Sequence, residues 1–319
     1  MRNVVIEVMK KWILIIFVLL SVTISLFSQT APESHFIVTL TKDNAGAIIT
    51  RYRGPERIVI IPDTIQGMPV REIGERAFTG NTDIEGVMIP EGVIRINGSP
   101  VTDAHRPYIG AFSDCKRLYL ITMPRTLRLI GYGTFANCTA LRSIDIPEGV
   151  TEIQEYIFLR CENLDSVTLP STLTKIGNNA FSHCISLTSV TLPAGLREIG
   201  QGAFSHSGLI SFPDPWPRGL TTIGESMFSS SKMRTAIIPE GITNIDSGAF
   251  IYCNNLTSVT LPSTIRRIES SLNSNSLTTI NIPESVRRIE FVGNIFYGSV
   301  NLTLSSQARL RQLGYSGNF

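Results

Sequence analysis

Hydrophobic and polar positions follow one another in a pattern that returns every 23 residues along most of this chain. One period reads L-x-x-I/V-x-I/L-P-x-x-L/V-x-x-I-x-x-x-A/I-F-x-x-C, where x is any residue. Six prolines keep the 23-residue step or a multiple of it: Pro124, Pro147, Pro170, Pro193, Pro239 and Pro262. Irregular units surround four more: Pro62, Pro90, Pro217 and Pro283. We count ten units, and a fixed period of this length is typical of a repeat solenoid.

The first part of each unit predicts a short β-strand with one buried face. Before Pro170, Val167 and Leu169 alternate with Ser166 and Thr168, as in a strand whose apolar side chains point inward. The proline lacks an amide hydrogen and therefore ends the strand pairing. Beyond it, a short helical or irregular turn carries a recurring phenylalanine: Phe78, Phe112, Phe135, Phe158, Phe181, Phe204, Phe228 and Phe250.

One unit cannot bury these apolar faces alone, so stacked units must share a continuous core. Neighbouring parallel strands lie about 4.8 Å apart, which gives ten units an arc of roughly 45–50 Å. We predict a solenoid over residues 62–304, with short parallel strands on its concave side and turns and short helical segments on its convex side. Residues 29–61 predict a cap of short strands. Residues 305–319 predict a cap helix that begins near Ser305 or Ser306 and stops at Gly314.

The repeat resembles the BspA-like leucine-rich repeats of bacterial surface and secreted proteins. The resemblance covers roughly residues 56–304 and rests on the motif I-P-x-x-L/V-x-x-I-x-x-x-A-F-x-x-C. It implies a leucine-rich-repeat solenoid and a secreted or cell-surface location in a bacterium. It also implies that the partner is an extracellular-matrix, plasma or cell-surface protein, although domains of this kind serve many ligands.

The first 28 residues predict a secretory signal peptide that is not part of the fold. Arg2, Lys10 and Lys11 precede an apolar run of 16 residues from Trp12 to Phe27, and mostly small or polar residues follow. An uncleaved membrane anchor is the competing interpretation, although a span needs about 20 apolar residues. We expect membrane contact through this segment alone.

The rest of the chain carries no net charge. The whole chain has 28 basic and 26 acidic residues; three of the basic and one of the acidic lie in residues 1–28, which leaves 25 of each. A nucleic-acid-binding protein would usually carry a strongly basic footprint. The composition therefore argues against a nucleic-acid partner.

Five cysteines occupy one slot of the repeat: Cys115, Cys138, Cys161, Cys184 and Cys253. We interpret them as a column of small buried thiols, because buried cysteine behaves as a small hydrophobic residue. Disulfides are the alternative, since neighbouring units are close enough and export favours oxidation, but side chains in a ladder point the same way. A straight column also lacks the tetrahedral arrangement that zinc prefers.

The remaining residues do not combine into a catalytic or cofactor site. His183 and His206 share a slot in adjacent units without a third ligand, which favours surface residues over a metal site. His35 and His105 form no recognisable triad, and the glycines follow the repeat rather than a phosphate-binding motif. We therefore predict that the protein is not an enzyme and uses no cofactor or metal.

Binding specificity is expected where the sequence departs from its period. An insertion of 11 residues near residues 97–108 carries four candidates: Asp103, His105, Arg106 and Tyr108. The segment 213–217 replaces the end of a strand and displays Trp216, a residue type enriched in binding hot spots. Matching slots of two consecutive units form a basic patch: Arg266, Arg267, Arg287 and Arg288. Each departure also has a structural interpretation: a tolerated insertion, a packing residue, and a solvated face neutralised by Glu269 and Glu290.

The predicted strand face is rich in Ser and Thr, so it is flat and suits a broad protein contact better than a small-molecule pocket. The leading hypothesis is an exported, surface-associated, adhesin-like protein that binds host or neighbouring-cell proteins. A structural component of the cell envelope that binds other repeat proteins is the alternative. An enzyme with a site in the inserted loop is the third hypothesis. The sequence leaves the oligomeric state open.

Overall fold

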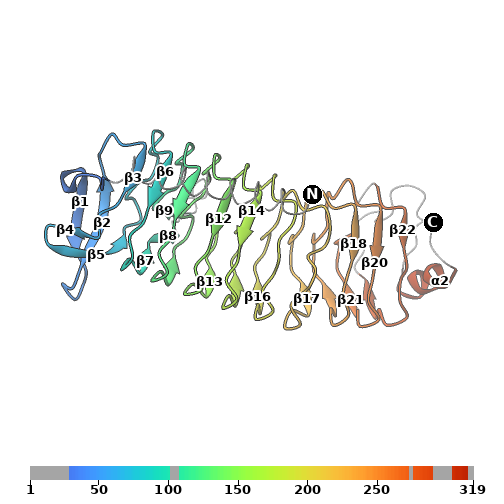
Figure 1. Cartoon of the computed structure of the whole chain (residues 1–319). Helices are drawn as coiled ribbons and strands as arrows, with labels where there is room; N and C mark the ends of the chain where they lie inside the picture. The colour runs from blue at the N-terminus through green and yellow to red at the C-terminus, as the bar shows by residue number, and fades with distance from the viewer. Residues whose placement is uncertain (1–28, 101–107, 273–275, 290–303, 315–319) are drawn as a thin grey trace, which may run out of the picture.

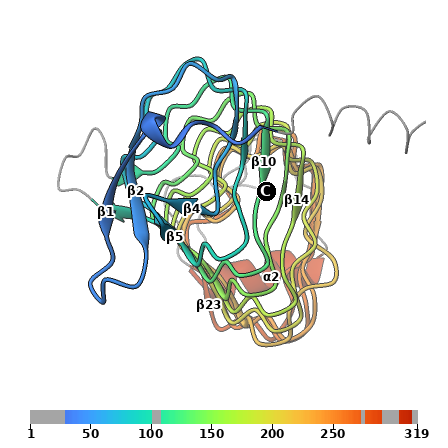
Figure 2. The same ribbon diagram turned by 60° about the vertical axis from the view of Figure 1, so that its left-hand side comes forward.

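The computed structural model describes residues 29–100, 108–272, 276–289 and 304–314. Within them the chain winds into an elongated solenoid, and its turns follow one another in sequence order from β1 to α2 (Figure 1). Seen from another side, the coils lie over one another around a common interior (Figure 2). The predicted repeat solenoid is therefore confirmed.

One parallel ladder is made of the strands that precede the prolines. Its pairings are β10 with β6 and β6 with β3, β12 with β14, and β18 with β20 and β20 with β22. The bounds are β3 (Ile58–Ile60), β6 (Gly86–Met88), β10 (Leu120–Thr122), β12 (Ser143–Asp145), β14 (Ser166–Thr168), β18 (Thr235–Ile237), β20 (Ser258–Thr260) and β22 (Thr279–Ile280). We call the outward side of this ladder the strand face.

A second parallel ladder, which the sequence did not predict, follows the prolines. Each of its short strands ends on a buried or half-buried isoleucine, and the residue before that isoleucine faces outward. The bounds are β5 (Met68–Ile73), β7 (Arg95–Ile96), β11 (Leu129–Ile130), β13 (Glu152–Ile153), β15 (Lys175–Ile176), β16 (Glu198–Ile199), β17 (Thr222–Ile223), β19 (Asn244–Ile245), β21 (Arg267–Ile268) and β23 (Arg288–Ile289). Strands of two residues are too short to leave an alternating pattern in the sequence.

The third side of each coil is a turn, not a helix. The amide of each phenylalanine donates to a carbonyl of the next coil, for example Phe158 to Ala180 at 2.8 Å. The residue that precedes the cysteine slot has a positive φ, as in Asp114 (63°), Asn137 (61°) and His183 (61°). Asn, Asp and His tolerate this left-handed conformation better than most residues, which explains why polar residues recur at that position.

The phenylalanines form one stacked column through the core. Consecutive rings from Phe78 to Phe250 lie 4.9–5.9 Å apart and are nearly parallel. Tyr52 continues the column at 5.2 Å from Phe78, and Phe36 packs on Tyr52 at 5.2 Å. Two residues outside the regular repeat thus carry the aromatic core into the N-terminal end.

The N-terminal end is closed by a hairpin of β1 (Phe36–Leu40) and β2 (Ala47–Tyr52), preceded by the 3-10 turn η1 (Glu33–His35). β2 pairs with β5 in parallel, so the hairpin covers the first edge of the second ladder. A short strand, β4 (Thr64–Ile65), pairs antiparallel with β5. β3 lies in the segment that the sequence assigned to the cap, yet it pairs with β6 in the regular register. The first ladder therefore begins at Ile58.

At the other end, helix α2 (Leu304–Gln312) packs on the last coil. Leu310 is fully buried, and Arg309 Nε donates to the carbonyl of Val286 at 3.1 Å. The helix already includes Ser305 and Ser306, and Ser306 Oγ accepts from the amide of Ile282 at 2.9 Å instead of capping the helix. In the part of the chain that the structure describes, no helix is long and apolar enough to cross a membrane.

Glutamates that follow the prolines fasten one coil to the next. Glu148 accepts from the amide of Ser171 at 3.1 Å and from its hydroxyl at 2.9 Å. Glu240 repeats the arrangement with Ser263, at 2.9 and 3.0 Å. The bonds from Ser171 lower the pKa of Glu148 because they favour the charged carboxylate. These acids are exposed, but they connect coils.

We expect Glu148→Gln to lower the urea midpoint of unfolding slightly at neutral pH. Because the folded state depresses the pKa of Glu148, its contribution is complete above the unfolded-state pKa and disappears as pH falls through the folded-state value. The difference from wild type should therefore vanish once the pH falls below the folded-state pKa of Glu148, where the wild type carries a neutral acid and the variant a neutral amide. The matched control is Glu284→Gln, in the same slot of the last unit, for which the described residues show no such bond; an equal loss in both variants would contradict the coil-to-coil role.

Candidate functional site

The strand face presents rows of short hydroxyl side chains. Ser143 on β12, Ser166 and Thr168 on β14, and Thr260 on β20 are all exposed, while their neighbours Ile144 and Val259 are buried. Parallel pairing in register places equivalent residues side by side, as in Ser143 with Ser166. The result is a long surface with little relief, which suits a broad contact.

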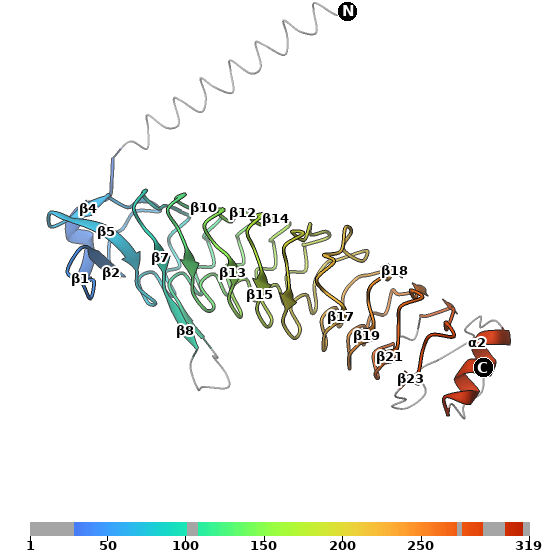
Figure 3. The same ribbon diagram turned by 90° about the horizontal axis from the view of Figure 1, so that it is seen from below.

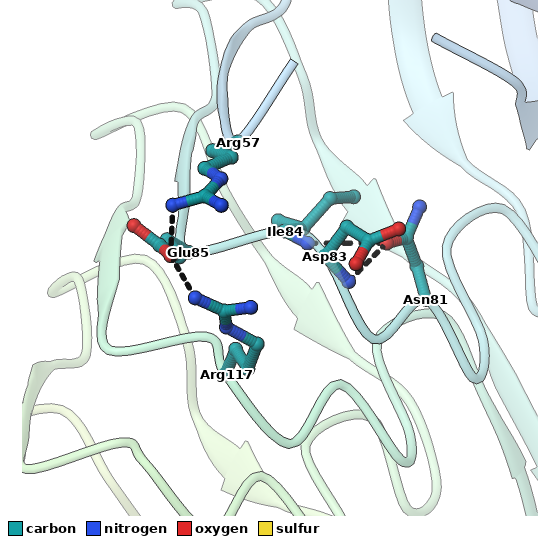
Figure 4. Close-up of polar contacts among 6 residues, drawn as sticks. All are labelled: Arg57, Asn81, Asp83, Ile84, Glu85 and Arg117. Carbon is teal, nitrogen blue, oxygen red and sulfur yellow. Dashed lines mark hydrogen bonds and ion pairs between the residues drawn. The ribbon is translucent and has the colours of Figure 1, made fainter. Parts of the chain in front are cut away.

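Charged residues flank this face at the position before several of its strands, as Arg57 does before β3 and Glu85 before β6. Glu85 Oε1 lies 3.3 Å from Arg57 Nη1 and 2.6 Å from Arg117 Nη2, so one carboxylate bridges two guanidinium groups from neighbouring coils (Figure 4). Beside it, Asn81 Oδ1 accepts from the amides of Asp83 and Ile84 at 3.0 and 3.1 Å and holds the preceding turn. Exposed ion pairs of this kind stabilise little by themselves, but they order the rim of the face.

Large apolar side chains also reach solvent on or directly beside this face. Ten such side chains are exposed among the described residues, and four belong here: Tyr119 (50%), Leu120 (37%), Ile210 (51%) and Ile237 (70%). Aromatic and aliphatic side chains at the surface serve as anchors in protein interfaces. The strand face is therefore the surface best suited to hold a protein partner.

The strand face is interrupted between β14 and β18. Residues 187–192 and 209–214 fill the strand slots of two units but form no strand. The second of these segments touches the next coil through an isolated bridge, Ser211 to Thr235, whereas β18 and β20 pair at three successive residues. The interruption coincides with the segment 213–217, so this departure from the repeat is also a gap in the sheet.

Trp216 supports the edge of this gap from within. Its side chain is half-buried against the core, and its ring lies 4.8 Å from that of Phe212. Its indole Nε1 donates to the carbonyl of Leu220 at 3.0 Å. Trp216 thus takes the packing role that the sequence left as an alternative, and direct contact with a partner remains a prediction.

The inserted segment leaves the solenoid as an antiparallel hairpin of β8 (Gly98–Pro100) and β9 (Tyr108–Gly110), which projects from the body (Figure 3). Ser99 Oγ donates to Glu75 Oε2 at 2.6 Å and ties the base of the hairpin to the preceding coil. Asp103, His105 and Arg106 lie outside the described residues, as does the side chain of Tyr108. Their role in binding stays a prediction.

The four arginines of the predicted basic patch do lie together. Arg267 and Arg288 are partners in the second ladder, and the amide of Arg287 donates to the carbonyl of Arg266 at 2.8 Å. Arg267 is paired with Asp246 at 3.2 Å and with Glu269 at 2.8 Å. Arg266 donates to the carbonyls of Ser263 and Ile265. Arg266 and Arg267 therefore have structural bonds. Glu290 lies outside the described residues, and ligand binding by the patch stays a prediction.

The five cysteines are buried and free, as the small-thiol interpretation predicted. Each Sγ lies 3.1–3.2 Å from the carbonyl oxygen of a phenylalanine one coil earlier, as Cys161 does from Phe135. Burial raises the pKa of the Cys115 thiol to about 12, and it also raises the pKa of the other four thiols. The slot therefore selects a small residue that donates weakly to a turn carbonyl.

We expect the native protein to react with less than about one equivalent of a thiol reagent at pH 8, because the nucleophile is the thiolate and burial suppresses it. After denaturation all five thiols should react. Fewer than five in the denatured, unreduced protein would indicate a disulfide, and fast reaction before denaturation would contradict the buried column.

The turn, the two ladders and the cysteine slot define the repeat, and the model of one family matches it. The family is described as BspA type leucine rich repeat region, in six copies, and it matches residues 108–216 and 210–303. The chain belongs to this family. As a BspA-type repeat chain, it has the leucine-rich-repeat solenoid that the sequence predicted.

Solved structures provide further comparisons with this BspA-type chain. A leucine-rich cell surface protein from Faecalibacterium prausnitzii is 25% identical, over 85% of this chain and 86% of the other, with a TM-score of 0.49. The leucine-rich repeat protein of T. pallidum is 26% identical, over 91% and 99%, with a TM-score of 0.41. The pneumococcal vaccine antigen PcpA is 16% identical, over 82% and 76%, with a TM-score of 0.56, and shares the fold. No curated protein sequence matches the chain.

The two histidines of the BspA-type turn slot stack on each other. Their ring centroids are 4.3 Å apart, and both residues have a positive φ. Burial, followed by the neighbouring His206, lowers the pKa of His183. In the described part of the chain no three His, Cys, Asp or Glu side chains are grouped to hold a metal. We therefore interpret the two histidines as part of the turn in each repeat unit.

The residues of the strand face that the sequence-based candidates missed are Tyr119, Leu120, Ile210 and Ile237. Ile237 stands in an outward slot where Thr168, Thr191 and Thr260 stand in other units. Ile60 and Met88 are half-buried in the same slot of the first two units, whereas Ile237 is exposed there. Ile237 was overlooked because an isoleucine within an apolar stretch is indistinguishable from a core residue until its side of the strand is known.

Proposed function

We propose that this chain is an exported, surface-associated scaffold that binds other proteins in the manner of an adhesin. The observation that carries the proposal is the strand face, a hydroxyl-rich surface that includes four of the ten large apolar side chains exposed among the described residues. A stable protein interface buries roughly 800 Å² on each partner, and a face that crosses successive coils offers such an area.

Two further features support export and surface association. Residues 1–28 have the sequence features of a secretory signal peptide. The BspA-type repeat also resembles the repeats of secreted and cell-surface proteins of bacteria. We propose an extracellular-matrix, plasma or cell-surface protein as the partner and no nucleic acid. The five cysteine thiols are buried, which supports a binding role over thiol-based catalysis.

The test is binding of the exported protein to immobilised extracellular-matrix and plasma proteins, together with protease accessibility on intact expressing cells. We expect saturable binding to at least one of them, and cleavage of the repeat domain from outside. Tyr119→Ala on the strand face should weaken binding about tenfold. Tyr252→Ala removes a tyrosine of similar exposure, 62% against 50%, from the turn side and should leave binding unchanged. Absence of any saturable ligand would overturn the proposal, and binding to envelope repeat proteins alone would favour the structural alternative.

A further inference from the structure

The gap in the strand face leaves one edge of β18 open. On its other edge β18 pairs with β20 through the peptide groups beside Ile237: the amide of Ile238 donates to the carbonyl of Thr260 at 2.9 Å. Peptide groups alternate in direction along a strand, so those of Ile237 face the segment 209–214. In the described chain that segment reaches β18 through the bridge Ser211–Thr235. No backbone hydrogen bond joins the described residues 209–214 to Ile237.

A groove lies at this open edge. Its volume is 340 Å³, and its lining combines the distorted segment with β18 and the proline after it: Ser211, Phe212, Pro213, Asp214, Thr235, Ile237 and Pro239. Phe212 and Pro213 are buried and form its wall, and Phe212 is fixed by Trp216 from behind. The Ile237 side chain, 70% exposed, stands at its border. The groove is therefore apolar and rests on fixed residues.

The polar groups at the groove indicate the charge of what it accepts. Asp214 is exposed, and its carboxylate is the charged group in the lining. Arg234 is the exposed cation at the start of β18, and its carbonyl accepts from the amide of Thr257. An exposed strand edge is a template for another strand, and a nearby carboxylate favours a basic side chain on it.

We propose that this groove binds an extended segment of a protein partner, which adds a strand along the open edge of β18. The segment would place an apolar side chain against Ile237 and Phe212 and a lysine or arginine toward Asp214. Main-chain hydrogen bonds would supply affinity and alternate side chains would supply specificity, as in other strand additions. The inference rests on the proposed function and names the part of the strand face that recognises the partner.

The test measures the binding of a capped peptide, Lys-Thr-Val-Thr-Val-Lys, to the exported protein by calorimetry or fluorescence anisotropy. We expect saturable binding with a Kd below about 1 mM. A peptide of the same sequence in which alternate amide nitrogens are methylated cannot donate backbone hydrogen bonds from one of its two edges. It should bind at least about tenfold more weakly. Replacing both lysines by glutamine should weaken binding to wild type but not to Asp214→Asn.

Ile237→Arg should weaken binding of the peptide at least about tenfold. Thr168→Arg, at the same outward position of β14, should leave peptide binding unchanged. A second variant replaces residues 212–217 by Val-Thr-Leu-Pro, the sequence of residues 190–193, so that the ladder can close; it should fold and lose the peptide. Equal binding to wild type and Ile237→Arg, or indifference to methylation, would overturn the inference.

The two proposals can fail separately. If the protein binds matrix or plasma proteins and Ile237→Arg binds them equally well, the groove is not the recognition site but the binding scaffold stands. If the peptide binds as expected and no extracellular protein does, strand addition stands and the adhesin-like function falls.

Discussion

Replacing Phe158 by alanine is expected to lower the free energy of unfolding by about 3–5 kcal/mol, the usual cost of emptying a large aromatic site in a core. The ring is fully buried and is stacked between Phe135 at 5.6 Å and Phe181 at 5.3 Å. Each coil contacts only its neighbours, so a cavity at this position weakens the contact on both sides. Urea denaturation followed by circular dichroism measures the loss.

The matched control is Tyr252→Ala, which removes an aromatic ring that is 62% exposed on a turn and should change stability by less than about 0.5 kcal/mol. Phe158→Ala should also make unfolding less cooperative, because a weakened middle coil separates the two halves of the array. A loss below about 1 kcal/mol would show that neighbouring coils collapse into the cavity, and the stacked column would then not be the main source of stability.

Replacing Gly110 by alanine should be the second most damaging change, with an expected loss of about 3 kcal/mol from overpacking. A Cβ at Gly110 would lie 2.1 Å from the carbonyl oxygen of Gly133, and one at Gly98 would lie 2.2 Å from that of Tyr132. These glycines are where the β8–β9 hairpin leaves the solenoid and passes close to the backbone of the next coil. The obstacle is backbone on both sides, so it cannot be relieved by a change of rotamer.

Gly195→Ala is the appropriate control, because its nearest atoms would be 3.7 Å from the added Cβ, an ordinary contact. It should be neutral or slightly stabilising, since alanine restricts the unfolded chain more than glycine does. Thermal unfolding of the two variants should therefore differ by several degrees. Similar melting temperatures would mean that the hairpin base can shift, and that its close packing does not hold the insertion in place.

The spacing of prolines, phenylalanines and cysteines in the sequence was sufficient to predict the repeat solenoid, the inward side of the first ladder and the buried thiols. These follow from local rules, because a fixed period forces equivalent residues into equivalent positions. The second ladder was not predicted, since two residues such as Lys175 and Ile176 carry no periodicity. The link from Glu148 to Ser171 was missed for another reason: it joins residues 23 apart, and the sequence alone does not say which coil faces which.

The candidate binding surface, too, was predictable from the sequence only in part. Sequence alone singled out the segment around Trp216 because it breaks the period, and period-breaking needs no three-dimensional information. Only the tertiary structure decided that Trp216 packs inward on Phe212 while Ile237, 21 residues later, stands open at the gap. The physical reason is that a strand's exposed side and its unpaired edge are properties of its neighbours in space. The sequence by itself therefore determined the family and the scaffold, and the stacking of its coils decided which edge of that scaffold is left free.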